Sequence, residues 1–310
     1  MRLALLFLAL LVLPASASAG TLAVDDRTAT FTAAPGEANA VTYATTGSDK
    51  AIALVIADTG APVTPGDGCT AVDANTVSCP ARQIESLKVA LGDGSDTFAP
   101  GEKDSPFLDL DVNAGAGDDN VLAGGYHQND NTLDGGAGAD TITSGEAVDT
   151  FIDGDSDPDT LTAGDELFDE LSFAPRQTGV TADAVTEAGP DGGTIKGFKN
   201  LIGSKGDDTL TGEGTLLGGP GDDKLRHGPD ASFESLLGGP GDDDLTTNGT
   251  ASGQAGNDAL HGLGKRPSLA SGAGDDTFDA ERGGKFRGLE GQDTFTCGRG
   301  TEVIVYPDPG

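Results

Sequence analysis

The chain has 310 residues with 51 acidic and 18 basic side chains, so its formal net charge is −33. This charge argues against direct binding to nucleic acid or to an anionic lipid surface, since both are polyanions. The chain also has 49 glycines, no tryptophan and few other aromatic residues. High charge with few aromatic residues is typical of disorder unless bound cations neutralise the acids. A regular internal repeat would favour the folded, cation-neutralised state.

Residues 1–19, "MRLALLFLALLVLPASASA", predict a secretory signal peptide. They contain one arginine, an apolar run and a small-residue "ASA" end that places cleavage after Ala19. The apolar run is too short to span a membrane. No later segment is as apolar, so we expect a secreted, extracellular mature chain without a membrane span. Loss of Arg2 changes the formal net charge from −33 to −34.

Residues 20–88 alternate apolar and polar side chains, as in "TLAVDD" and "AIALVIAD", between Gly/Pro turns. This pattern predicts a β-rich region that caps the N-terminal end of the repeats described next. Cys69 and Cys79 bracket nine residues, and they predict a disulfide in an oxidising compartment. Cys297 would then be unpaired, either as a buried apolar residue or as a reactive thiol.

Residues 89–171 and 201–296 are two arrays of the unit G-G-x-G-x-D-x-U, where U is apolar. Clear copies are "GGAGADTI" at 135–142 and "GGPGDDKL" at 218–225, whereas "GDSDPDTL" at 154–161 is degenerate. The sixth position holds Asp96, Asp119, Asp140, Asp159, Asp208, Asp223, Asp243, Asp258, Asp276 and Asp293. The turn glycines predicted to belong to the sites are Gly136, Gly138, Gly206, Gly219, Gly221, Gly239, Gly241, Gly256, Gly274 and Gly291.

Apolar residues keep a fixed register to these aspartates in both arrays. Two positions after each aspartate lie Phe98, Val121, Ile142, Leu161, Leu210, Leu225, Leu245, Leu260, Phe278 and Phe295. Seven positions before lie Val89, Val112, Leu133, Ile152, Leu201, Leu216, Leu236, Ala251, Leu269 and Phe286. Each Asp-centred turn is therefore predicted to join two short strands that each point one apolar side chain inward. No coil could fold alone, so we expect stacked coils with one continuous row of turns along one edge, rather than two rows.

These copies resemble the RTX, or hemolysin-type, calcium-binding nonapeptide repeat, and the resemblance covers about 89–171 and 201–296. It implies an all-β fold, a parallel β-roll or β-solenoid with calcium-binding Gly/Asp-rich turns and a β-rich N-terminal cap. It also implies that several Ca²⁺ ions are held by the repeat aspartates and turn carbonyl oxygens, which are the hard ligands that Ca²⁺ requires. The chain departs from the family by its cleavable N-terminal signal, so type I secretion is not implied. No toxin or enzyme domain accompanies the repeats.

Two segments flank the second array. Residues 172–200 lack the repeat, and "GVTADAV" and "GTIKGF" predict a protruding hairpin with "EAGPDGG" as its turn. This hairpin is either a recognition loop or a tolerated insertion. Residues 297–310 predict a C-terminal cap strand, because Val303 and Val305 lie on one face of an extended segment.

Two acidic stretches need separate interpretation. "DGDSDPD" at 153–159 resembles the opening of an EF-hand loop, but the twelfth position holds Gly164 where a bidentate glutamate is needed. A degenerate repeat turn is the preferred interpretation. "GDELFDEL" at 164–171 is not predicted to form a site, because Thr162 stands where the repeat requires an apolar residue.

The sequence contains no H-E-x-x-H, G-x-S-x-G or phosphate-loop motif. We therefore expect no enzyme but a structural or adhesive module with calcium and cell-surface or matrix components as partners. A hydrolase of unrecognised type is the alternative, and a pocket with clustered, perturbed carboxylates away from the repeat turns would favour it. A third alternative is an ice-binding solenoid with an outward threonine file, interrupted at Lys224, Asp244 and Ala259: Thr97, Thr141, Thr160, Thr209, Thr277 and Thr294.

Overall fold

The computed structural model describes residues 19–47, 52–101, 108–124, 130–164, 168–231, 234–263, 267–280, 284–288, 290–298 and 303–306. Apart from Ala19, the predicted signal peptide lies outside these residues. The described chain is nearly all-β, with one 3₁₀ turn, η1 (Pro190–Gly192). In these segments no helix has the length and hydropathy that a membrane span needs.

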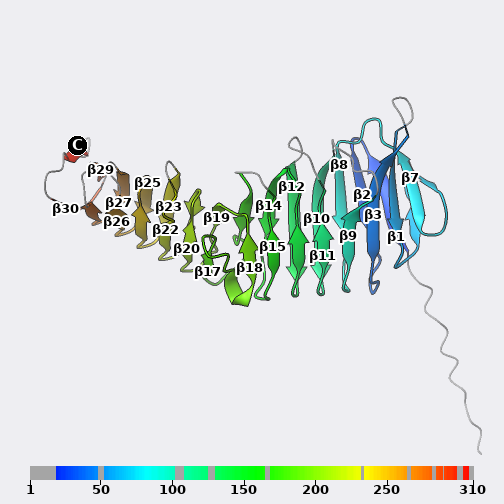
Figure 1. Cartoon of the computed structure of the whole chain (residues 1–310), viewed down its shortest axis with the longest axis horizontal. Coiled ribbons are helices and arrows are strands. Elements are labelled where there is room, and N and C mark those ends of the chain that lie inside the picture. The colour runs from blue at the N-terminus through cyan, green and yellow to red at the C-terminus, as the bar shows by residue number, and fades with distance from the viewer. Residues whose placement is uncertain are drawn as a thin grey trace, which may run out of the picture.

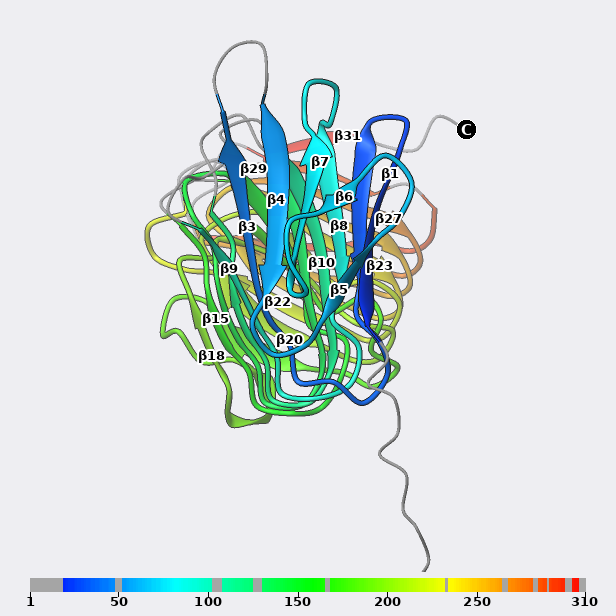
Figure 2. The ribbon, with the colours of Figure 1, turned by 90° about the vertical axis from the view of Figure 1, so that its right-hand side faces the viewer.

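Long parallel sheets form an elongated body whose coils stack from the N-terminal to the C-terminal end (Figure 1). Viewed from the N-terminal end, the strands of successive coils lie behind one another (Figure 2). Each repeat coil gives one strand to each of two faces, because its Asp-centred turn leads the chain from one face to the other. This arrangement is consistent with the predicted β-solenoid.

One face is a single sheet of fifteen strands. From the C-terminal end these are β31 (Val303–Tyr306), β29 (Gly284–Arg287), β27 (Ser268–Ala273), β25 (Thr250–Ala255), β23 (Ser235–Pro240), β21 (Leu216–Leu217), β19 (Asn200–Ile202), β16 (Glu170–Ser172), β14 (Val148–Ile152), β12 (Asp130–Ala137), β10 (Asp109–Ala116), β8 (Ser86–Ala90), β2 (Thr28–Thr32), β1 (Gly20–Asp25) and β5 (Val63–Pro65).

The other face is divided into two sheets, of nine and seven strands. The nine are β18 (Thr194–Lys196), β15 (Thr160–Thr162), β13 (Thr141–Thr143), β11 (Asn120–Leu122), β9 (Thr97–Pro100), β3 (Ala40–Thr46), β4 (Ala53–Asp58), β7 (Thr76–Pro80) and β6 (Thr70–Ala71). The seven are β17 (Thr181–Asp183), β20 (Thr209–Gly212), β22 (Lys224–His227), β24 (Asp244–Thr247), β26 (Ala259–Gly262), β28 (Thr277–Ala280) and β30 (Thr294–Cys297).

The apolar positions of the repeat stack in register inside the coils, as predicted. Leu210, Leu225 and Leu245 are partners in β20, β22 and β24, and each is 0% exposed. On the long sheet, Leu216 pairs with Leu236 and both are equally buried. Side chains alternate across each strand, so buried residues alternate with residues of the outer face; β10, for example, buries Leu110, Val112 and Ala114. The repeat positions therefore form two facing files in the core, to which some strands add further buried residues.

One predicted core position is wrong. Ile152 is only half-buried, whereas Phe151 is 0% exposed and pairs with Leu133 in the adjacent coil. The degenerate turn that leads to Asp159 is one residue longer than the other turns, so its inward position lies one residue earlier. Phe295 is only partly buried, and it stacks on Phe278.

The N-terminal region continues both faces and then adds antiparallel strands. β2 is parallel to β8 and β3 is parallel to β9, whereas β1 pairs antiparallel with β2, and β4 pairs antiparallel with β3 and β7. The predicted Cys69–Cys79 disulfide is present and ties the residue before β6 to β7. At the other end, β31 pairs with β29, as the predicted last strand requires. The side chain of Cys297 is outside the described part of the structure, so its state stays a prediction.

The segment 172–200 does not form the predicted protruding hairpin. β17 pairs with β20, and β18 pairs with β15, both in parallel. Ala188 bridges antiparallel to Asp183 on one side and to Thr194 on the other. Both strands have the register of the coils, so the segment joins the two sheets of the divided face instead of projecting from it.

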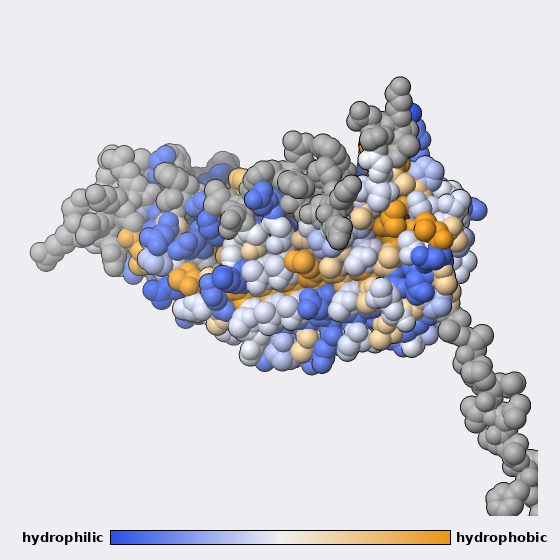
Figure 3. Space-filling view, turned by 45° about the vertical axis from the view of Figure 1, so that its right-hand side comes forward, coloured by the Kyte–Doolittle hydropathy of each residue, from blue (hydrophilic) through white to orange (hydrophobic). Residues whose placement is uncertain are grey.

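The surface seen in Figure 3 combines hydrophilic patches with a narrow apolar band along the flank. Exposed apolar side chains include Leu122, Val185 and Leu263, which are 40–44% exposed. The predicted outward threonine file is exposed at every one of its six positions. It is interrupted as the sequence predicted, and ice binding remains an untested alternative.

Candidate metal centre

The repeat aspartates line one edge of the stack, just before the strands of the divided face. We call these ten residues the aspartate row: Asp96, Asp119, Asp140, Asp159, Asp208, Asp223, Asp243, Asp258, Asp276 and Asp293. All are buried except Asp293, which is half-buried. Within each array, the Oδ1 atom of one aspartate accepts a hydrogen bond from the backbone N–H of the aspartate one coil earlier. These N···O distances are 2.7 to 3.3 Å.

The second carboxylate oxygen is the unusual feature of the row. Oδ2 is buried and has no hydrogen-bond partner in Asp96, Asp119, Asp140, Asp223, Asp243, Asp258 and Asp276. Buried polar atoms in native proteins nearly always have a partner, and burying a carboxylate without compensation is costly. A file of such atoms is a set of acidic oxygens that could bind a metal ion.

Glycine allows the turns to stack in direct contact. A Cβ atom on Gly117 would lie 1.7 Å from the Gly94 carbonyl oxygen, and one on Gly241 would lie 1.9 Å from the Gly221 carbonyl oxygen. Both glycines also have φ values, 134° and 142°, that side chains disfavour. Main-chain oxygens of one turn thus face the next turn with nothing between them. Positive φ is shared by these predicted turn glycines: Gly136, Gly138, Gly219, Gly221, Gly239, Gly241, Gly256, Gly274 and Gly291.

Gly206 is the exception among the predicted turn glycines, because its φ is not positive. A Cβ atom there would lie 2.5 Å from the Gly179 amide nitrogen, so close backbone approach still requires glycine. At Gly238 a Cβ atom would lie 2.0 Å from Oδ2 of Asp243. The carboxylate therefore folds back over the first glycine of its own turn.

Burial and mutual repulsion raise the pKa values of several aspartates of the row. Burial raises the pKa of Asp243 to about 8, and the neighbouring charges of Asp258 and Asp223 add to the effect. Burial likewise raises the pKa of Asp140, Asp159 and Asp223 to about 7, and that of Asp96 to about 6. A backbone N–H donor to each carboxylate opposes the shift. Near neutral pH these groups need either a proton or a cation.

In the metal-free protein, folding should therefore be more favourable at pH 5 than at pH 8. A pKa raised above the usual 3.8 means that the folded state holds the proton more tightly than the unfolded state. Stability is then greatest at low pH and falls as the pH rises toward about 8, the pKa of Asp243. The measurement is the far-UV circular dichroism signal in excess chelator, with excess calcium as the control that removes this dependence. An equal or larger β signal in chelator at pH 8 would contradict the prediction.

A second line of acids, missed by the sequence analysis, runs beside the row on the exposed side. The amide N–H of Asp222 donates to Asp207, that of Asp242 to Asp222, and that of Asn257 to Asp242, over 2.7 to 2.9 Å. The sequence does contain a signal for this second line, because the fifth position of the repeat unit is repeatedly Asp or Asn. These groups increase the negative potential at the turns, which raises the local concentration of cations.

The prediction of one continuous row is wrong, because the row is interrupted between Asp159 and Asp208. Thr194 lies opposite Thr160 and Thr181 lies opposite Thr209, so the preceding residues, Gly193 and Val180, occupy the places where further aspartates would stand. The N–H of Val180 still donates to Oδ1 of Asp208 over 2.7 Å. The segment 172–200 therefore keeps the backbone stacking but separates the row into two parts.

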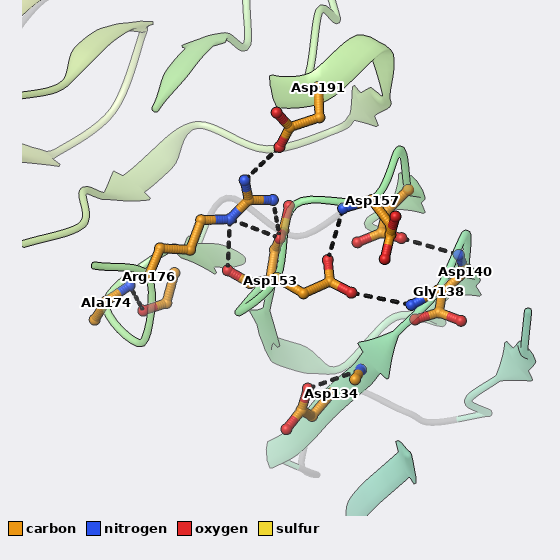
Figure 4. Close-up of polar contacts among 12 residues, drawn as sticks. Asp134, Gly138, Asp140, Asp153, Asp157, Ala174, Arg176 and Asp191 are labelled. Atoms are coloured by element: carbon orange, nitrogen blue, oxygen red, sulfur yellow. Dashed lines mark hydrogen bonds and ion pairs between the residues drawn. The ribbon is translucent and has the colours of Figure 1, made fainter. Parts of the chain in front are cut away.

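Arg176 lies at this interruption (Figure 4). Its Nε–H donates to Oδ1 of Asp153 over 3.0 Å, and its other guanidinium nitrogens pair with Asp153 and Asp191. The ligand atoms of Asp153, Asp155 and Asp159 lie within 4.8 Å of one another. Burial raises the pKa of Asp153 to about 6, while Arg176 opposes the shift. A buried guanidinium thus supplies positive charge at the point where the repeat is degenerate.

No protein-family model matches this chain, and no curated protein matches it either.

Proposed function

We propose that this chain is an exported protein whose aspartate row binds several Ca²⁺ ions, and that these ions complete the fold of a structural or adhesive extracellular module. The supporting observation is the file of buried Oδ2 atoms without partners, such as those of Asp223, Asp243 and Asp258. Each belongs to a carboxylate in register with the next coil, where a cation would contact two coils at once.

The chemistry of the donors favours calcium. The turns offer carboxylate and main-chain carbonyl oxygens, and Ca²⁺ takes six to eight oxygen ligands in flexible arrangements. Zinc prefers nitrogen and sulfur ligands, which the repeat unit does not contain. When bound, the ion would neutralise buried charge and link adjacent turns. The ligands are those of the aspartate row with the turn carbonyl oxygens.

A structural role follows from where the proposed sites lie. They recur along the stack and join one coil to the next. Bound ions would therefore stabilise the stacking of all the coils rather than serve one catalytic centre. The long exposed faces would serve as the contact surface for a cell-surface or matrix component. Lack of enzymatic activity, export and the nature of the partner remain predictions from the sequence.

Calcium binding by residues 20–310 tests the proposal directly. Equilibrium dialysis at calcium concentrations of about 10⁻⁴–10⁻³ M, the range of extracellular modules, should show several ions per chain. Asp223→Asn should bind fewer ions than the wild type, because it removes a row charge while keeping the Oδ1 acceptor. Asp230→Asn removes an exposed acid outside the row and should bind as many ions as the wild type. No binding in this range, or equal binding by all three proteins, would refute the proposal.

A further inference from the structure

A second ladder of polar side chains lies at the opposite edge of the first array. There the chain returns from the divided face to the long sheet, between β13 and β14 and between β15 and β16. A Cβ atom on Gly164 would lie 1.6 Å from the Gly145 carbonyl oxygen, so the two loops approach each other at these residues as closely as the Asp turns do. The Gly164 N–H also donates to the Ser144 hydroxyl over 3.1 Å.

The ladder consists of two acids between two amides. The Asp149 N–H donates to Oδ1 of Asp169 over 2.9 Å, and both aspartates are 0% exposed. Asn131 precedes them: its Nδ2–H donates to Oδ1 of Asp149 over 2.7 Å, and its Oδ1 accepts from the Leu110 N–H over 3.0 Å. Asn200 follows, with Nδ2–H donating to the Asp169 carbonyl oxygen over 3.3 Å.

Amides at both ends show that asparagine suffices for this hydrogen bonding. Two adjacent buried acids are therefore not required by the ladder itself, and they place two negative charges in neighbouring coils. Oδ2 of Asp149 is buried and has no hydrogen-bond partner. Burial raises the pKa of Asp149 to about 6, the Ser144 hydroxyl and Asn131 oppose the shift, and the charge of Asp169 adds to it. No basic side chain is among these influences.

We propose that Asp149 and Asp169, together with the Ser144 hydroxyl, bind one divalent cation of the calcium type at the edge opposite the aspartate row. The oxygen-only donor set and the two adjacent buried carboxylates fit such an ion. The loops lack the glycine-aspartate unit, which is why the sequence predicted turns of this kind along one edge only. This site does not depend on the proposed function of the row.

The ion content of Asp149→Asn in the chain 20–310 tests this site. Asparagine keeps the ladder, as Asn131 does one coil earlier, so the variant should fold in excess calcium and bind one Ca²⁺ fewer than the wild type. Asp223→Asn is the matched control, and its loss should add to that of Asp149→Asn in the double variant. Equal ion content in Asp149→Asn and the wild type would overturn the proposal. Loss of an ion in Asp149→Asn but not in Asp223→Asn would refute the row and keep this site.

A crystal structure of the unaltered chain grown with calcium gives a second readout that does not depend on the folding of a variant. A density peak should lie about 2.3–2.6 Å from Oδ2 of Asp149, the distance of Ca²⁺–oxygen ligation. A peak at hydrogen-bond distance, or none, would show that water or a proton takes the place of the ion and would overturn the proposal.

Discussion

Calcium chelation is expected to abolish most of the far-UV circular dichroism β signal of residues 20–310, and added calcium is expected to restore it. Residues 20–310 carry a formal net charge of −34 once Arg2 is removed from the −33 of the whole chain, and the buried carboxylates of the row follow one another from coil to coil. Without cations this repulsion and the burial of charge oppose compaction. Because the ligands converge only in the folded chain, the free energy of metal binding becomes folding free energy. A β spectrum that excess chelator leaves unchanged would refute this dependence.

Asp243 allows the electrostatic and hydrogen-bonding parts of this effect to be separated. Its Oδ1 accepts the Asp223 N–H over 2.9 Å, while its Oδ2 has no partner. Asp243→Asn removes the charge and keeps an acceptor for that N–H. Asp243→Ala removes both, and an unsatisfied buried N–H costs about 1–3 kcal/mol whatever the calcium concentration.

The two variants should therefore differ in a thermal melting series against calcium concentration. For Asp243→Asn, the rise of Tm with calcium should be flatter than in the wild type, because fewer ions bind on folding. For Asp243→Ala, the rise of Tm with calcium should be equally flat. In addition, Tm should be lower at every calcium concentration, by roughly 2–4 °C for each kcal/mol lost. Asp230→Asn, an exposed substitution, should reproduce the wild-type slope. A wild-type slope in Asp243→Asn would exclude this carboxylate as a calcium ligand.

The sequence was sufficient for the repeating part of the fold because one coil repeats one set of constraints. Leu225 and Leu245 had to be buried together, since each follows its aspartate by the same two positions and the coils stack in register. The same rule failed at Ile152, where one extra residue in the turn moved Phe151 into the core. The spacing from the repeat aspartate therefore predicts which residue is buried only where the turn has a constant length.

The parts that could not be predicted are contacts between segments that share no pattern. Asp149 and Asp169 meet across loops whose sequences have no common unit, so only the stacking of the backbone reveals their ladder. The interruption of the row was equally hidden, because the strands of 172–200 predict a hairpin locally but find partners in the adjoining sheets. In both cases, contacts between segments that are distant in the sequence determined the structure.

Among the basic residues that the structure describes, Arg176 is expected to be the one whose loss lowers stability most. Its side chain and that of Asp153 are 5% and 2% exposed, and the guanidinium also lies 5.6 Å from the centroid of the Phe173 ring. Removing one partner of a buried ion pair leaves an uncompensated charge and costs about 3–5 kcal/mol. Arg176→Met keeps much of the apolar stem but leaves Asp153 without its counterion.

A double-mutant cycle with Asp153→Asn tests this role by urea unfolding in excess calcium. The single change Arg176→Met should lower the free energy of unfolding by about 3–5 kcal/mol. The double variant should be less damaged than the sum of the two single variants, because no buried charge is left unpaired. Arg27→Met provides the matched control, since Arg27 pairs with Glu85 at 58% and 54% side-chain exposure and should cost no more than about 1 kcal/mol. If Arg176→Met costs no more than Arg27→Met, the buried ion pair of Arg176 does not have the expected effect on stability.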